Sequence, residues 1–68
     1  MYHLIIKHGW RGREKDICIA SSTDLTTLKE HYLMAESMAQ NPRVYETELM
    51  PPSLDRLDSE VLVDNPGF

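Results

Sequence analysis

The first fifty residues alternate between short apolar runs and polar connections, which is the pattern of a small domain built from strands and a helix. Residues 2–8 and 16–20 are rich in β-branched and aromatic types, as half-buried strands are. Alternate apolar positions of the first run share one face: Tyr2, Leu4 and Ile6. Gly9 and Gly12 lie between the runs and can adopt positive φ. The pattern predicts a β-hairpin with strands at 2–8 and 16–20.

A helix is predicted over residues 23–40. Its start is marked by a polar cluster at 21–24, where Asp24 can accept the free amide hydrogens of a first turn. Apolar side chains then recur at spacings of three and four: Leu25, Leu28, Tyr32, Ala35 and Ala39. Asn41 precedes Pro42 and should avoid the α region, so the helix is expected to end there.

Three further apolar side chains lie beside this stripe: Leu33, Met34 and Met38. The apolar surface is therefore wider than one helix needs to cover a small sheet. Two explanations stay open. The methionines can pack in the core as methionines ordinarily do, or they can form a surface for a partner, including a second copy of the chain in a homodimer.

A third strand is predicted over residues 43–50, with one buried and one solvated face. Tyr45, Thr47 and Leu49 lie on one side of it, and Val44, Glu46, Glu48 and Met50 lie on the other. The two prolines at 51–52 have no amide hydrogen to donate, so they end the ladder. Beyond them, residues 53–61 fit a short helix and residues 60–64 fit a short strand, and the sequence leaves both open.

These elements predict an α+β domain over residues 1–50, followed by an acidic C-terminal extension over residues 51–68. Their order favours a small two-layer ββαβ sandwich, in which a three-stranded, mainly antiparallel sheet carries one helix on one face. The third strand is expected to pair beside the first.

Length and charge narrow the classes of function. The chain has 68 residues and a net charge of −4, so its core is small and generic affinity for nucleic acid is not expected. Residues 1–44 carry six basic and five acidic side chains, whereas residues 45–68 carry one basic and six acidic. No apolar run approaches the roughly 18 residues of a membrane span, and the start lacks the pattern of a signal peptide. We expect a cytoplasmic protein without membrane contact.

The cysteine, histidine and glycine residues of the chain do not form the patterns that enzymatic chemistry requires. Cys18 lies between Ile17 and Ile19, where a buried and inert thiol is the expected state. The three histidines are not spaced like a zinc signature: His3, His8 and His31. No glycine-rich phosphate motif is present. We therefore predict no catalytic residue, no metal site and no cofactor.

Two segments are candidates for binding a partner. In the hairpin loop, Trp10 can be a binding anchor beside Arg11 and Arg13, or it can fold back over one end of the sheet; both interpretations stay open. The acidic segment can dock on a basic partner surface through apolar anchors among its carboxylates, or it can be a solvated tail or a cover for the sheet. The predicted partner-binding residues are Trp10, Arg11, Arg13, Asp55, Asp58 and Glu60.

Residues 1–50 also resemble a group of small, mostly uncharacterised ββαβ proteins encoded by bacteriophages and prophages. The resemblance lies in Met1-Tyr2-His3-Leu4-Ile5-Ile6, Ala20-Ser21-Ser22, the helix with Tyr32, and Tyr45-Glu46-Thr47-Glu48-Leu49. It implies an early or accessory phage protein, and characterised small phage proteins often bind and block a host enzyme. The segment after Pro51 departs from this pattern.

The expected function is therefore a non-enzymatic protein-binding modulator. The resemblance implies a phage-type inhibitor of a host enzyme, or of a defence or transcription complex, that acts in the host cytoplasm. The resemblance does not identify the target protein. The alternative is a small nucleic-acid or nucleotide-binding protein that uses Trp10, Arg11, Arg13 and Lys15.

Overall fold

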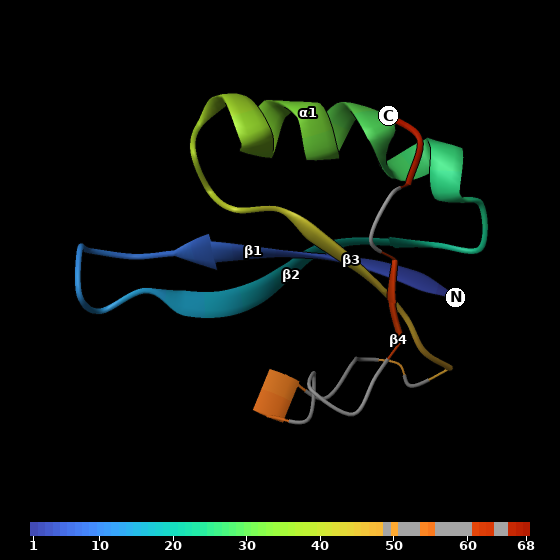
Figure 1. Cartoon of the computed structure of the whole chain (residues 1–68). Coiled ribbons are helices and arrows are strands. Elements are labelled where there is room, and N and C mark those ends of the chain that lie inside the picture. Colours follow the sequence, from blue (N-terminus) through green and yellow to red (C-terminus); the bar gives the residue numbers. More distant parts are fainter. Residues whose placement is uncertain (49, 51–53, 56–60, 64–65) are drawn as a thin grey trace.

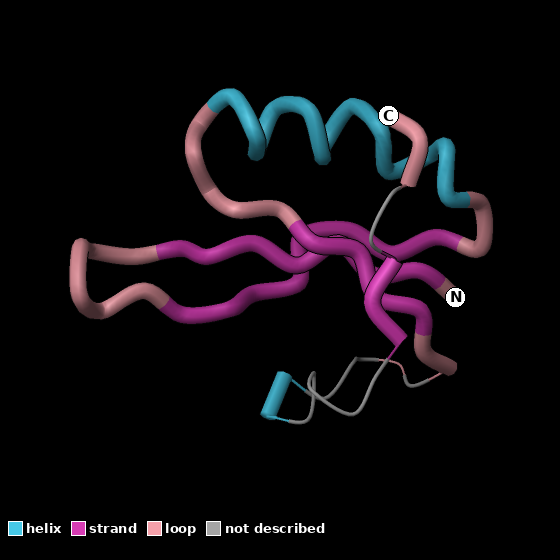
Figure 2. The backbone as a smooth tube through the Cα atoms, in the orientation of Figure 1, coloured by secondary structure: helices cyan, strands magenta, loops and turns pink. Residues whose placement is uncertain are grey.

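The computed structural model describes residues 1–48, 50, 54–55, 61–63 and 66–68 of the chain, and these form two layers (Figures 1 and 2). The elements follow in the order β1 (Tyr2–His8), β2 (Lys15–Ser22), the 3₁₀ helix η1 (Leu25–Leu28), α1 (Lys29–Ser37), β3 (Arg43–Glu46) and β4 (Val61–Val63). The strands form one antiparallel sheet in the order β2-β1-β3-β4. Figure 1 shows α1 lying across one face of this sheet.

The predicted α+β class is confirmed, as is the pairing of the third strand beside the first. The predicted number of strands is wrong, because β4 adds a fourth strand at the edge of β3, where Val44 pairs with Val63. Of the two alternatives for the C-terminal segment, the short strand is present at 61–63. Most of the alternative helix at 53–61 lies outside the described residues, which include only a short helical turn at 54–55.

The core is organised around β1, which is buried on both faces. Leu4 packs against Leu28 and Val44 on the helix side, and Ile5 packs against Tyr45 on the other side. Both Leu4 and Ile5 have no exposed surface. A strand with neighbours on both edges and burial on both faces favours apolar residues on both faces, which explains why residues 4–6 do not alternate with polar types.

The third strand differs from its prediction in length and in burial. β3 ends at Glu46, which is paired with Tyr2 at the very start of β1. The amide of Thr47 donates to the carbonyl of Met1 at 3.0 Å. The face expected to be solvated carries Val44, which is buried, and both faces of β3 therefore contribute to the core.

A β-bulge in β2 changes which side chains share a face. Leu4 pairs with Ala20 whereas Ile5 pairs with Cys18, so Ile19 is the extra residue. In a regular strand Cys18 and Ser21 would point to opposite faces. The bulge instead brings the Cys18 Sγ within 3.5 Å of the Ser21 Oγ, and Cys18 is half-buried beside Ile5.

The helical segment is shorter than predicted at both ends. Asp24 caps its start as expected, because its Oδ1 accepts from the Thr26 amide at 3.0 Å and from the Thr26 hydroxyl at 2.7 Å. The first turn is 3₁₀ and α1 begins only at Lys29. The predicted end at Asn41 is wrong because the chain leaves the helix earlier, at Ala39, which has a φ of 56°.

The end of α1 has the hydrogen bonds of a Schellman motif. The amide of Gln40 donates to the carbonyl of Ala35 at 3.0 Å, and the amide of Ala39 donates to the carbonyl of Glu36 at 3.1 Å. The position after the helix cap is usually glycine, since a Cβ is strained in the left-handed region. Here an alanine occupies it, so the motif is strained at Ala39.

Ala39→Gly is accordingly expected to stabilise the fold. Removing the Cβ relieves about 1 kcal/mol of backbone strain, which should raise the melting temperature by about 4 °C in a domain of this size. Ser37→Gly is the matched control, because Ser37 lies within α1 and glycine there should lower the melting temperature. Thermal unfolding followed by circular dichroism tests both; a lower melting temperature for Ala39→Gly would contradict the assigned conformation.

The cap at Asp24 should also make stability depend on pH. The hydrogen bonds from the Thr26 side chain and amide lower the pKa of Asp24 below its ordinary value of 3.8. A carboxyl whose pKa is lower in the folded state stabilises the fold above its unfolded pKa, and this stabilisation is lost as pH falls below about 4. Asp24→Asn keeps a capping oxygen without the charge, so its denaturant midpoint should fall less steeply over this range than that of the native chain. Equal slopes would contradict the role of the Asp24 charge.

Candidate functional site

The loop between β1 and β2, residues 9–14, forms a tight turn that we call the hairpin tip. The amide of Arg13 donates to the carbonyl of Trp10 at 2.7 Å, and Gly12 takes a φ of 83° at the third position of this turn. Gly9 has a φ of 132°, and a Cβ there would lie 2.8 Å from the Arg13 carbonyl oxygen. Both glycines are therefore required by the shape of the backbone, and they fix where Trp10 is presented.

The side chain of Trp10 points into solvent, with 85% of its surface exposed. Of the two interpretations of this residue, the one in which Trp10 covers the end of the sheet is thus contradicted. Arg11 and Arg13 are also exposed on the same turn. The structure brings these three predicted residues together, whereas their role in binding a partner stays a prediction.

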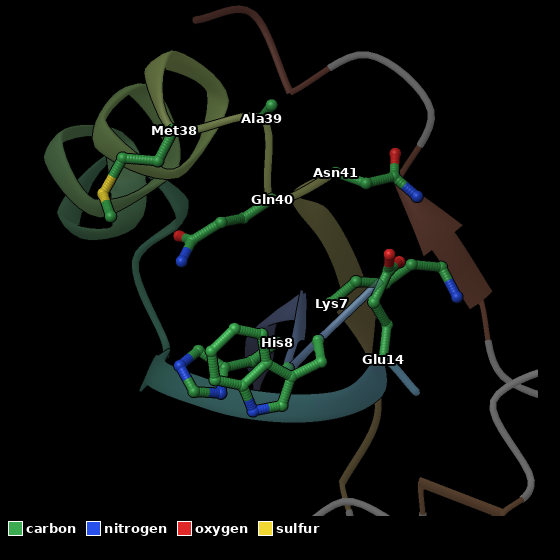
Figure 3. Close-up of a pocket in the computed structure, with 9 residues that line it drawn as sticks. Lys7, His8, Glu14, Met38, Ala39, Gln40 and Asn41 are labelled. Atoms are coloured by element: carbon green, nitrogen blue, oxygen red, sulfur yellow. The ribbon is translucent and has the colours of Figure 1, made fainter. Parts of the chain in front are cut away.

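A cavity of about 530 Å³ opens beside the hairpin tip, and we call it the tip cavity. One wall comes from the hairpin, through Lys7, His8, Trp10 and Glu14. The other wall comes from the connection between α1 and β3, through Met38, Gln40 and Asn41. Figure 3 shows His8 and Gln40 extending from opposite sides of the cavity.

A backbone hydrogen bond joins the two walls of the tip cavity. The amide of Lys7 donates to the carbonyl of Gln40 at 2.8 Å. Ala39 and Asn41, on either side of Gln40, both have positive φ, so this connection is a compact turn and not an extended loop. The cavity is therefore formed by backbone that is already held in place.

The wall formed by Met38, Gln40 and Asn41 was not part of the predicted site. The signal that could have located it is the expected pairing of the third strand beside the first. In an antiparallel pair the entry of one strand lies next to the exit of the other, and Arg43 does pair with Ile5. Residues just before Arg43 must then lie beside the end of β1.

At this end of the sheet some cations are paired with a carboxylate and others are not. Asp16 accepts a hydrogen bond from the Arg43 guanidinium and lies 3.7 Å from the Lys7 ammonium, so two cations face one carboxylate. Within the described part of the chain, Arg11, Arg13 and Lys15 form no ion pair, and Glu14 is the one carboxylate that lines the cavity. The hairpin tip therefore carries a local excess of positive charge.

Asp55, the described member of the acidic half of the predicted site, lies apart from the hairpin tip. Asp55 is exposed, and Figure 1 shows residues 54–55 on the side of the sheet opposite α1 and away from the β1–β2 loop. Asp58 and Glu60 lie outside the described residues. The proposed binding role of these three carboxylates stays a prediction.

Methionine packing in the core does not account for the apolar surface of α1. Met34 and Met38 are 65% and 60% exposed, and Leu33 is 42% exposed. The interpretation of these methionines as core residues is therefore wrong. A partner surface, including a homodimer contact, stays a prediction for this side of α1.

One further pair of side chains could in principle take part in catalysis, His3 and Ser21, and its histidine is buried within the sheet. The His3 Nδ1 lies 2.6 Å from the Ser21 Oγ, and His3 has no exposed surface, so this pair is closed to a substrate. The His3 Nε2 has no hydrogen-bond partner among the residues that the structure describes. Among the described residues, no three side chains of the metal-binding types come together. No helix of the described residues has both the length and the apolar character needed to cross a membrane.

Comparisons with known proteins found no matching family model, no matching curated protein and no matching solved structure. The resemblance to small phage proteins is thus still a prediction.

The exposure of Trp10 predicts that it contributes nothing to stability. Trp10→Ala should change the free energy of unfolding by no more than about 0.5 kcal/mol, as other exposed substitutions do. Ile5→Ala is the contrast, because deleting a fully buried isoleucine side chain costs about 2–5 kcal/mol. Denaturant unfolding of the two variants measures the difference. A loss in Trp10→Ala similar to that in Ile5→Ala would mean that Trp10 covers the core after all.

Proposed function

We propose that this chain is a non-enzymatic protein-binding module that contacts its partner through the hairpin tip. The observation that carries the proposal is the 85% exposure of Trp10 on a turn whose conformation requires glycine at two positions. A large exposed aromatic on an ordered turn gains nothing for the fold, and it is the type of side chain that most often supplies binding energy at interfaces. Because tryptophan has only two side-chain torsions, ordering it on binding costs little entropy.

The side chains around Trp10 support the same function. Arg11 and Arg13 are exposed beside it, and arginine is enriched at interfaces together with tryptophan. Met38, which is 60% exposed, lines the tip cavity with Trp10 and extends the apolar surface onto α1. An apolar centre with a charged rim is the usual composition of a binding surface between two proteins.

We further propose that the module acts by inhibition, blocking a host enzyme or a defence or transcription complex in the cytoplasm. This step rests on the resemblance to small phage proteins and not on the geometry. The acidic residues Asp55, Asp58 and Glu60 are proposed as a second surface, which steers encounter with a basic face of the partner and is screened over about 8 Å at physiological ionic strength.

Nucleic-acid binding is the second candidate, and one observation favours it. Arg11, Arg13 and Lys15 lie near an exposed tryptophan and form no ion pair with described residues, so they could contact phosphates while a base stacks on Trp10. The net charge of −4 opposes it, since affinity for nucleic acid requires an excess of clustered cations. Titration with single-stranded and duplex oligonucleotides at physiological salt separates the two functions.

The protein-binding function predicts a Trp10-dependent partner. Immobilised native protein should retain from a bacterial lysate one or more proteins that Trp10→Ala does not retain, as quantified by mass spectrometry. For a retained protein, Trp10→Ala should weaken binding by about 2 kcal/mol, which is about 30-fold in Kd. Met50→Ala is the matched control, because Met50 is an exposed apolar side chain outside the hairpin tip.

Retention of the same proteins by the native chain and by Trp10→Ala would contradict the proposed function. So would tight, salt-sensitive oligonucleotide binding that is lost in an Arg11→Glu, Arg13→Glu variant, since that result assigns the hairpin tip to nucleic acid.

A further inference from the structure

We infer that the tip cavity, together with the exposed side of α1 at Met34 and Met38, binds a short acidic peptide segment that carries a large apolar anchor side chain. The inference rests on the proposed function, because it names the chemistry of the partner that the hairpin tip would contact. It follows from three features of the described residues: the volume of the cavity, the apolar side chains that continue from it, and the unpaired cations on the hairpin that forms one of its walls.

The cavity has room for an anchor side chain. Its volume of about 530 Å³ falls within the range of small-ligand pockets and exceeds the volume of any single amino-acid side chain. Met38 and Trp10 supply apolar contact surface, while His8, Gln40 and Asn41 supply hydrogen-bonding groups on the two walls. A peptide presents the matching combination, with an apolar side chain and a polar backbone.

The apolar surface continues from the cavity along α1. Met34 and Met38 are four residues apart, so their side chains are neighbours on one face of the helix. Both are more than half exposed. Methionine adapts its shape to the side chain that it contacts, which suits a surface that receives an extended or helical peptide.

Charge on the hairpin beside the cavity favours acidic residues on that peptide, because the cations Arg11, Arg13 and Lys15 outnumber Glu14, the carboxylate that lines the cavity. Arg11, Arg13 and Lys15 have no ion-pair partner among the described residues, whereas Asp16 is already faced by Arg43 and Lys7. An arginine fork binds a carboxylate through two parallel hydrogen bonds, so carboxylates beside the anchor would meet unoccupied donors. A peptide with lysines at those positions would meet repulsion.

The same features disfavour a nucleic acid at this site. The exposed methionines offer apolar surface, which a sugar-phosphate backbone does not use. A long polyanion also experiences the whole net charge of −4, whereas a short peptide is sensitive mainly to charges within about one Debye length.

Selection from a random-peptide display library on the immobilised full chain tests the inference. At physiological salt, enriched peptides are expected to contain a large apolar residue with two or more Asp or Glu residues close to it. A synthetic peptide of the enriched sequence should then bind about tenfold or more weakly to Met38→Glu, which places a carboxylate in the cavity, and to the Arg11→Glu, Arg13→Glu variant. Spectra that show each variant to be folded accompany the titrations.

Two control variants carry substitutions of the same kinds at residues outside the site. Met50→Ala removes an exposed apolar side chain, and Lys29→Glu reverses an exposed charge at the start of α1. Both should leave the affinity for the peptide unchanged.

Three results would overturn the inference: no enriched peptide, enriched peptides without an acidic bias, or equal affinity of the selected peptide for Met38→Glu and the native chain. Displacement of the peptide by a single-stranded oligonucleotide at equal concentration would overturn it in favour of nucleic acid. If the inference fails in one of the first three ways while Trp10-dependent capture from the lysate persists, the proposed function stands with a partner of different chemistry.

Discussion

The burial of β1 on both faces is the constraint on which the rest of the structure depends. A chain of this size has a small core, and β1 supplies three of its buried apolar side chains, with Leu4 and Ile6 on one face and Ile5 on the other. That strand needs a neighbour at each edge and a cover on each side. β2 and β3 supply the edges, Leu28 of η1 covers Leu4, and Tyr45 of β3 packs against Ile5.

The candidate site is a consequence of this arrangement. Because β1 is central, its end lies between the turn into β2 and the turn into β3, and the hydrogen bond from Lys7 to Gln40 fastens these two turns together. Ile6 is thus the last residue of β1 that is buried in the core, and the residues that follow it in the chain extend beyond the core. Trp10 can be exposed without loss to the fold because the stabilising contacts of β1 are complete before the chain reaches it.

Much of the fold could be predicted from the sequence where a single strong pattern decided the outcome. The β-branched run at 2–8, the glycines of the loop and the cap at Asp24 each have a local physical cause, and the structure has a strand, a turn and a capped helical segment there. Predictions failed where a tertiary contact overrode the local preference. Ala39 adopts a left-handed conformation that favours glycine, and the bulge at Ile19 leaves no trace in the pattern. The strand at 60–64 stayed one of two alternatives because so short a segment shows no clear period. The same distinction applies to the candidate site. The part on the hairpin loop could be predicted because it consists of residues that are adjacent in the sequence, whereas Gln40 and Asn41 reach the cavity only through the pairing of β1 with β3.

Native-state hydrogen exchange measured residue by residue tests most directly whether β1 organises the core and holds the tip cavity. The amides of Leu4 to Ile6 should exchange only through global unfolding, and the amide of Lys7, which is bonded to Gln40, should be nearly as slow. Amides in the loop at 9–14 that have no partner should exchange quickly. A Lys7 amide that exchanged as fast as the loop would contradict this role of β1, and so would β1 amides less protected than those of the edge strand β2.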